Sequence, residues 1–219
     1  MNPSKIDIDR NVSKLRVNSA EFLNLEKSTL ISMLEETIEN ITSIAYYWAT
    51  LASEKKGTLT KSKEGEEWIG GPFACIYAIQ YFIESILNEE DLDISKFDDS
   101  TKSYKVFPTK NIEKLLFPFL EGEVKFGKNL SFEQINEYRG FANRFQNNKP
   151  KITLVLGAGN VSSIPVLDAL FHMIANKSVI YLKLNPVNDY LLPIFTQIFE
   201  PFIARGFMVV SEGDMKASQ

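Results

Sequence analysis

Apolar residues in the last third of the chain form short runs and one-sided stripes that alternate along the sequence. Ile152 to Leu156 is a short apolar run rich in β-branched residues, and it ends at Gly157-Ala158-Gly159. A buried parallel strand that enters a tight turn has this pattern. The next apolar residues recur at helical spacing on one side: Val166, Leu167, Leu170, Phe171 and Ile174. A strand followed by an amphipathic helix is therefore predicted.

The ends of this helix carry recognisable signals. Ser162 or Ser163 can cap its start, Pro165 suits its first turn, and Asn176 with Lys177 ends it.

Two more strands and a second helical segment follow. Val179 to Leu182 and Phe207 to Val210 are apolar runs, and Asp189 to Arg205 is a helical segment closed by Gly206. Residues 151–219 thus predict a partial Rossmann-like parallel sheet with the element order βαβαβ.

The first 150 residues are predicted to be mostly helical. Apolar residues at steps of three and four indicate an amphipathic helix: Leu30, Leu34, Ile38, Ile41, Ala45, Trp48 and Leu51. Glu35, Glu36 and Glu39 face outward from it, and Gly57 ends it.

A polar, glycine-bearing loop is expected after Gly57, with Glu64, Glu66 and Glu67 as its solvated face. Pro72 to Leu87 is apolar on nearly all sides and predicts a buried helix.

The residues from 88 to 150 are more polar. Asn88 to Ser103 is acidic and irregular, Asn111 to Leu120 predicts a short helix, and Glu123 to Phe126 predicts a strand turned by Gly127-Lys128-Asn129.

Ser131 and Gln134 then form a capping box for a helix that runs to about Phe145. Asn147 to Pro150 is a polar linker, so we place a domain boundary there. The fold class is α/β, with a mostly helical region at 1–150 and a partial βαβαβ unit at 151–219.

Composition narrows the class of protein. With 219 residues, 44% of them hydrophobic, the chain can bury a core. It has no apolar signal segment and no run of spanning length, which predicts a cytoplasmic protein with no membrane partner. The net charge of −4 is spread over the chain without a basic stripe, which argues against nucleic acid as a partner.

Three loops should meet where the parallel strands end, because ligands of open α/β sheets bind along that edge. They are Gly157 to Ser163, Lys183 to Asn188, and Ser211 to Asp214. They offer backbone N–H groups, a helix N-terminus, the cation of Lys183 and amides such as Asn185, so an anionic nucleotide is the expected ligand.

The glycine motif alone is weak evidence for a dinucleotide site. Gly157 and Gly159 fit it, but Ser162 stands where a third glycine would fall. Lys183 also replaces the acidic ribose partner that usually ends the next strand. A lysine there can meet ribose hydroxyls or a phosphate, and the alternative is a solvated lysine at a strand end.

The segments GAGNVSSIPVLDAL and VIYLKLNPVNDYLLPIF resemble the aldehyde dehydrogenase superfamily, most of all its acyl-CoA reductase side. The resemblance covers roughly the last third of the chain. It implies that Asn160 helps to form an oxyanion hole and that Lys183 holds the adenine ribose of NAD or NADP. It also implies an aldehyde or acyl thioester as substrate, and subunit contacts that make a homo-oligomer an open alternative.

Two departures from the family pattern limit what carries over. Pro186 stands where many NAD-preferring members have a glutamate, so NAD or NADP stays open as the cofactor. The family nucleophile is a cysteine far downstream, whereas the one cysteine of this chain, Cys75, lies upstream in the apolar helix and is expected to pack in the core. The single His172 is likewise expected to be a packed or surface residue, and no metal site is predicted.

The leading hypothesis is the N-terminal part of an NAD(P)-dependent aldehyde dehydrogenase or acyl-CoA reductase, catalytically silent by itself. The alternatives are a non-catalytic nucleotide-binding or assembly module and a structural fragment with an unformed site. One further expectation concerns aromatic residues that either line an acyl tunnel or, more in keeping with their helical spacing, form core: Tyr46, Tyr47, Trp48, Phe117 and Phe119.

Overall fold

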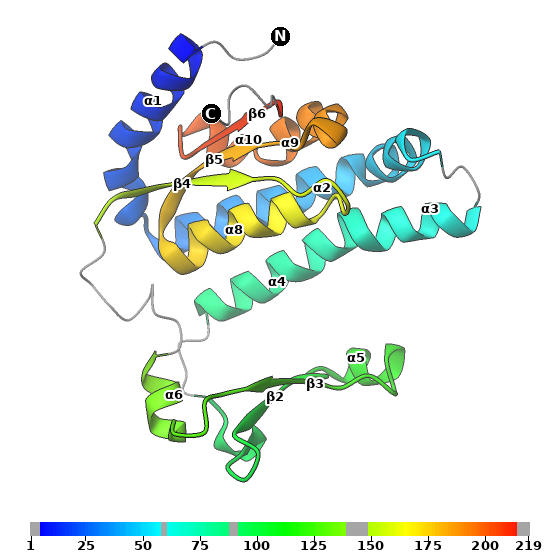
Figure 1. Cartoon of the computed structure of the whole chain (residues 1–219), viewed down its shortest axis with the longest axis vertical. Coiled ribbons are helices and arrows are strands. Elements are labelled where there is room, and N and C mark those ends of the chain that lie inside the picture. Colours follow the sequence, from blue (N-terminus) through cyan, green and yellow to red (C-terminus); the bar gives the residue numbers. More distant parts are fainter. Residues whose placement is uncertain (1–4, 58–60, 88–91, 139–148, 214–219) are drawn as a thin grey trace. The chain divides into compact units, whose positions relative to one another are not determined.

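The computed structural model describes residues 5–57, 61–87, 92–138 and 149–213 as an α/β protein (Figure 1). The chain divides into two compact units. The first unit combines Met1–Asn88 with Ala142–Gln219, and the second unit is Glu89–Phe141. This division joins the N-terminal helices to the parallel sheet, whereas the sequence was divided at about residue 150.

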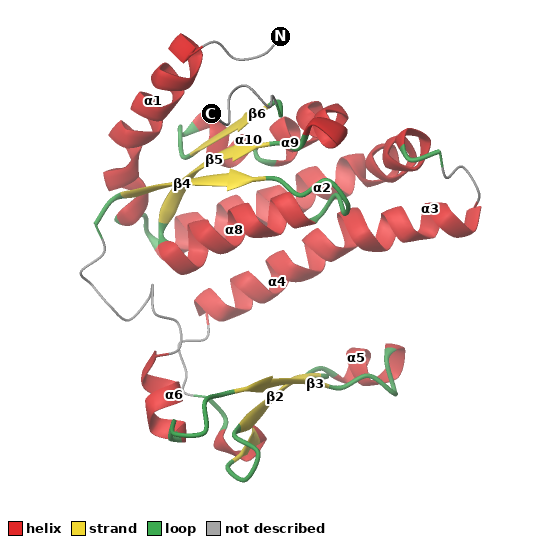
Figure 2. Cartoon of the chain, viewed as in Figure 1, coloured by secondary structure: helices red, strands yellow, loops and turns green. Residues whose placement is uncertain are grey.

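A parallel sheet of three strands lies at the centre of the described part of the first unit (Figure 2). Its order is β4 (Lys151–Leu156), β5 (Ser178–Lys183) and β6 (Met208–Ser211). Leu156 pairs with Lys183, and Lys183 pairs with Ser211, so the strands end level with one another. The predicted small parallel sheet is confirmed.

Helix α8 (Ile164–Asn176) connects β4 to β5 and has the predicted bounds and first-turn proline. Lys177 ends it in the left-handed conformation, with φ 46°. Ser163 occupies the cap position, but its side chain makes no capping hydrogen bond in the part of the chain that the structure describes. The Ser162 hydroxyl does not cap the helix either, and it accepts a hydrogen bond from Trp48 Nε1 instead.

The connection from β5 to β6 is divided into short helical pieces, whereas one continuous helical segment was predicted. It consists of η3 (Pro186–Leu191), α9 (Leu192–Ile198) and α10 (Glu200–Ala204). A proline stands near the start of each piece, and proline cannot donate the backbone hydrogen bond that a continuous helix needs there. Gly206, at φ 72°, closes the segment as predicted.

Both faces of the central strand β5 are covered, because every residue of this strand is buried. Helix α8 packs against β4 and β5, and so does α1 (Lys5–Leu23), an element that the apolar pattern did not reveal. Phe22 of α1 contacts Phe207 with ring centroids 5.1 Å apart.

The long helix α2 (Lys27–Lys55) packs against α9, α10 and α4 (Ala74–Leu87). It is the predicted amphipathic helix, with Trp48 fully buried, Glu35, Glu36 and Glu39 exposed, and Gly57 following it at φ 67°.

One prediction for residues 57–87 is wrong, and another is confirmed in part. Lys61–Trp68 forms a short helix, α3, that continues through the π-helical turn η1 (Ile69–Phe73) into α4, where a loop was expected. The predicted helix is present as α4 and is buried at Cys75, Ile79 and Ile86, but Leu87 at its end is exposed, as is Phe73 of η1. An apolar composition therefore overstated how much of this helix is covered.

The second unit contains a small antiparallel sheet of β1 (Phe97–Asp98), β2 (Ser103–Phe107) and β3 (Gly122–Lys125) among its described residues. The strand near Glu123 is confirmed, whereas residues 97–98 and 103 are ordered strand where an irregular segment was expected. The remaining elements are η2 (Ile94–Lys96), α5 (Asn111–Leu116) and α6 (Phe132–Tyr138).

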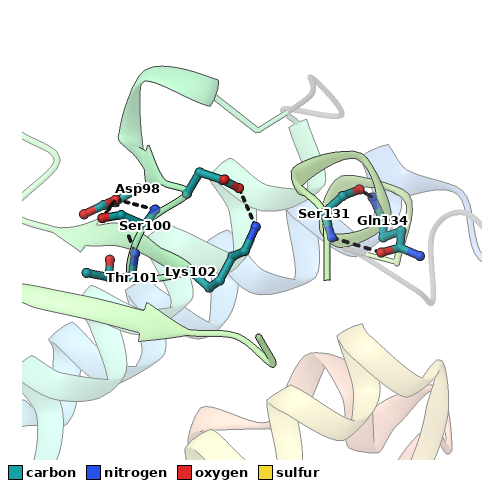
Figure 3. Close-up of polar contacts among 7 residues, drawn as sticks. Asp98, Ser100, Thr101, Lys102, Ser131 and Gln134 are labelled. Atoms are coloured by element: carbon teal, nitrogen blue, oxygen red, sulfur yellow. Dashed lines mark hydrogen bonds and ion pairs between the residues drawn. The ribbon is translucent and has the colours of Figure 1, made fainter. Parts of the chain in front are cut away.

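Side chains close the turns of this second unit (Figure 3). The Asp98 carboxylate accepts hydrogen bonds from the Ser100 backbone N–H at 2.9 Å and from Thr101. Ser131 and Gln134 exchange the two hydrogen bonds of the predicted capping box, which is confirmed. The expected end of that helix near Phe145 lies outside the described residues.

The aromatic residues considered for an acyl tunnel do not act as one group. On α2, Trp48 is buried in the core while Tyr46 and Tyr47 are exposed, so the three do not share a face. Phe117 and Phe119 belong to the second unit and are exposed as well. The core interpretation therefore holds for Trp48 alone.

Within the described ranges, no helix is both long and apolar enough to cross a membrane.

Candidate functional site

The three loops at the carboxyl ends of β4, β5 and β6 meet, as the parallel topology predicted. The contacts between one loop and the next are hydrogen bonds: Gly157 N–H to Lys183 O (2.8 Å), Leu184 N–H to Ser211 O (2.9 Å) and Asn188 Nδ2 to Ala158 O (2.9 Å). Gly213 N–H also donates to Asp189 Oδ1 (2.7 Å), in the residue that follows the second loop. Asp214, the last residue of the third loop, lies outside the described residues. Hydrogen bonds therefore hold the three loops of the candidate site together.

The glycines of this edge are needed for close packing of the loops. A Cβ on Gly157 would lie 3.2 Å from Lys183 O, and one on Gly159 would lie 2.9 Å from a Val187 methyl and 3.0 Å from the Asn185 side chain. Gly213 has the least room, since its Cβ would lie 2.1 Å from Leu184 O. A larger residue at any of these positions would push the loops apart.

Lys183 is the last residue of β5 and is only 9% exposed. It therefore differs from the solvated strand-end lysine that was the alternative interpretation. Lys183 also takes part in an interaction within the protein.

Asn185 shapes the second loop. Its Oδ1 accepts a hydrogen bond from Val187 N–H at 3.1 Å and so caps η3. The side chain is half-buried against Gly159. Asn185 therefore has a structural role in this loop, through its hydrogen bond to Val187 and its packing against Gly159.

Asn160, the candidate oxyanion residue, is exposed in a segment that is fixed to the helices of the first unit. Ser163 N–H donates to Gly70 O at 3.1 Å, and Trp48 Nε1 donates to Ser162 Oγ at 3.1 Å. Gly71 lies so close that a Cβ there would be 3.1 Å from the Ser162 oxygen.

A cavity of about 500 Å³ adjoins Asn160. Its lining includes Lys56, Glu66, Glu67, Ile69, Asn160 and Val161. Residues from the end of α2, from α3 and η1, and from the loop after β4 thus share one depression.

An ion pair forms one wall of this cavity. Lys56 Nζ lies 2.7 and 2.9 Å from the two carboxylate oxygens of Glu67, and 3.3 Å from the backbone oxygen of Asn160. Glu67 is only 5% exposed, so its prediction as part of a solvated loop face is wrong. The inward position of Glu67 depends on helix α3, which the sequence pattern did not predict.

The Tyr190 hydroxyl is buried near this carboxylate and has no hydrogen-bond partner among the described atoms. Burial raises the pKa of Tyr190 to about 12, and the charge of Glu67 acts in the same direction. The phenol is therefore neutral at pH 7.

Cys75 is a core residue, as predicted. It is completely buried in α4, and burial raises the pKa of its thiol, which keeps the sulfur protonated and unreactive at neutral pH. His172 Nδ1 lies 2.7 Å from Asn176 Nδ2 on the same helix. In the described parts of the chain, no three His, Cys, Asp or Glu side chains are grouped so that they could hold a metal ion.

Comparisons of the chain with protein-family models, with curated proteins and with solved structures gave no match. The relationship to the aldehyde dehydrogenase superfamily therefore stays a prediction from the residues themselves.

Proposed function

We propose that this chain supplies the cofactor side of an NAD(P)-dependent oxidoreductase of the aldehyde dehydrogenase or acyl-CoA reductase type. The observation that carries the proposal is the joining of three strand-end loops at one edge of a parallel sheet, with Lys183 at the centre of that edge. Ligands of open parallel sheets bind at this edge.

The residues at this edge of the sheet suit the adenosine half of the cofactor better than its nicotinamide half. Lys183 can donate to the ribose hydroxyls of the adenosine half, and the Asn185 Nδ2 group lies beside the same loop. The glycine turn is filled by the loop after β5, so Gly157 and Gly159 serve the shape of the site. The dinucleotide supplies a nicotinamide ring that exchanges hydride with the substrate carbon.

Asn160 would donate its side-chain amide to the oxygen of an aldehyde or acyl thioester. A preorganised donor of this kind stabilises the negative charge that develops on the oxygen. The nucleophile in this chemistry is not Cys75, because that thiol is buried and protonated. The chain alone is expected to show no dehydrogenase or thioester reductase turnover, even with saturating cofactor.

Replacement of Lys183 tests the cofactor site. Lys183→Ala should weaken NAD(P) binding by about 1.5 to 3 kcal/mol, the usual value for a hydrogen bond to a charged group. The measurement is calorimetric titration of the chain with NAD and with NADP. Lys151→Ala is the matched control, because Lys151 is an exposed lysine at the opposite end of the sheet.

Three outcomes decide the proposal. Binding that is weakened in Lys183→Ala and unchanged in Lys151→Ala supports it, provided that thermal unfolding shows both variants folded. Equal affinity of Lys183→Ala and the wild type removes this role from Lys183. A wild-type chain that binds neither dinucleotide overturns the proposed function. Binding of NADP as well as NAD is permitted, because Pro186 stands where many NAD-preferring members of the family have a glutamate.

A further inference from the structure

The Lys56 ammonium group joins three parts of the first unit at one point. Lys56 follows α2, Glu67 belongs to α3, and Asn160 lies in the loop after β4. The three N–H groups of the ammonium match three acceptors, namely both Glu67 oxygens and the backbone oxygen of Asn160. The side chain is thus committed to contacts within the protein.

Burial of the carboxylate makes this arrangement specific. Glu67 is almost fully removed from solvent, and a buried charge is costly unless it is paired. The pairing therefore fixes where the ammonium lies, and the ammonium in turn fixes the Asn160 carbonyl. Other contacts of this loop lie on both sides of Asn160: Gly157 and Ala158 bond to the loop after β5, and Ser162 and Ser163 bond to Trp48 and Gly70.

We propose that Lys56 and Glu67 are positioning residues for Asn160. They hold the peptide of Asn160 at the rim of the cavity, which fixes the backbone position from which its side-chain amide can reach a ligand oxygen. The assignment of that amide as an oxyanion donor rests on the proposed function, whereas the positioning itself can be measured without any cofactor. Glu67 acts only through Lys56, and neither residue is assigned a contact with substrate.

The test uses variants that separate charge from shape. Lys56→Met removes the ammonium and keeps the length of the side chain, but it leaves the Glu67 carboxylate buried and unpaired. The double variant Lys56→Met/Glu67→Gln removes both charges and avoids that defect. Lys56→Arg retains the cation. Lys55→Met is the matched control, because Lys55 is an exposed lysine one position earlier on α2.

Nuclear magnetic resonance supplies two readouts on the full chain. The first is the side-chain amide signal pair of Asn160, identified by its loss in Asn160→Asp. The second is hydrogen exchange of the Ser163 amide, which is bonded to Gly70 O. In the double variant we expect the Asn160 signals to shift or broaden and the Ser163 amide to exchange faster, because the nearby Asn160 carbonyl loses its hydrogen bond to Lys56. Amides of β5 should be unchanged.

The outcomes are decisive in both directions. Recovery of the wild-type Asn160 signals in Lys56→Arg, with no change in Lys55→Met, supports positioning by the cation. Unchanged Asn160 signals and Ser163 exchange in a folded double variant overturn the proposal. Titration with NAD in the same variants should give the wild-type affinity. A wild-type chain that binds no dinucleotide would contradict the proposed function, but it would not change the result on the positioning of Asn160.

Discussion

At the scale of single residues, burial decides which polar groups of this chain are available for chemistry. Lys183 and Glu67 are both nearly inaccessible, although a lysine at a strand end and a glutamate in a polar segment suggest exposure. The Lys56 ammonium compensates the Glu67 carboxylate for its lost hydration, and Lys183 also has an interaction within the protein. Sequence reasoning found Lys183 through its place after a strand, but it had no means of finding the pairing of Glu67 with Lys56.

The Tyr190 hydroxyl gives a prediction about pH. The pKa of Tyr190 is about 12 in the folded protein and ordinarily 10.0, so the folded state resists ionisation. A pKa raised on folding gives stability that is complete below pH 10 and is lost as the pH rises toward 12. Tyr190→Phe should therefore weaken the fall in stability between pH 10 and 12.

Urea unfolding of wild type and Tyr190→Phe at pH 7 and at pH 11 measures this effect. At pH 7 the variant should be as stable as the wild type or more stable, because the substitution removes a buried hydroxyl that has no partner among the described atoms. The same alkaline fall in both proteins would show that Tyr190 titrates normally and is not buried as described.

At the scale of elements, glycines at positive φ mark the points where helices end. Gly206 follows α10 at φ 72°, and Gly57 follows α2 at φ 67°. They differ in surroundings, because a Cβ on Gly206 would lie 2.3 Å from Asn18 Nδ2 of α1, whereas nothing lies within 4 Å of one on Gly57. A glycine at position 206 is therefore needed both for the positive φ of the turn after α10 and for the close packing of α1.

This difference predicts unequal effects of the same substitution. Gly57→Ala should cost about 1 to 2 kcal/mol, the price of the left-handed conformation alone. Gly206→Ala should cost more, because Asn18 must also move and its hydrogen bond to Gly206 O is disturbed. Chemical denaturation of the two variants measures both values. Equal losses would show that α1 does not press on Gly206.

Elements with a strong apolar period were predictable, and elements held by tertiary contacts were not. The bounds of α8 and β5 followed from the sequence because their apolar residues and end signals agree. Helix α1 was missed because its buried residues, Leu15 and Phe22 among them, are separated by many polar ones. The candidate site divides in the same way: topology placed the three strand-end loops together, whereas the cavity beside Asn160 needs α3 and η1.

At the scale of the whole molecule, the first unit is built from both ends of the chain. Its core combines residues of α1, α2 and α4 with residues of the parallel sheet and its connections, and Cys75 lies among them. The thiol can meet solvent only if these segments separate. The rate at which Cys75 reacts therefore reports whether the first unit is folded. Cys75 is also the one cysteine in the chain that could act as a nucleophile.

Thiol labelling tests both properties of Cys75. A maleimide or disulfide reagent at neutral pH should label the native chain at least about 10³ times more slowly than the unfolded chain, because labelling requires opening of a stable core. The rate should rise with denaturant in parallel with unfolding. Cys75→Ser serves as the blank for labelling, and it should leave any dehydrogenase turnover unchanged. Rapid labelling at pH 7, together with activity that disappears in Cys75→Ser, would require an exposed thiol of lowered pKa and would overturn both the core assignment and the exclusion of Cys75 as nucleophile.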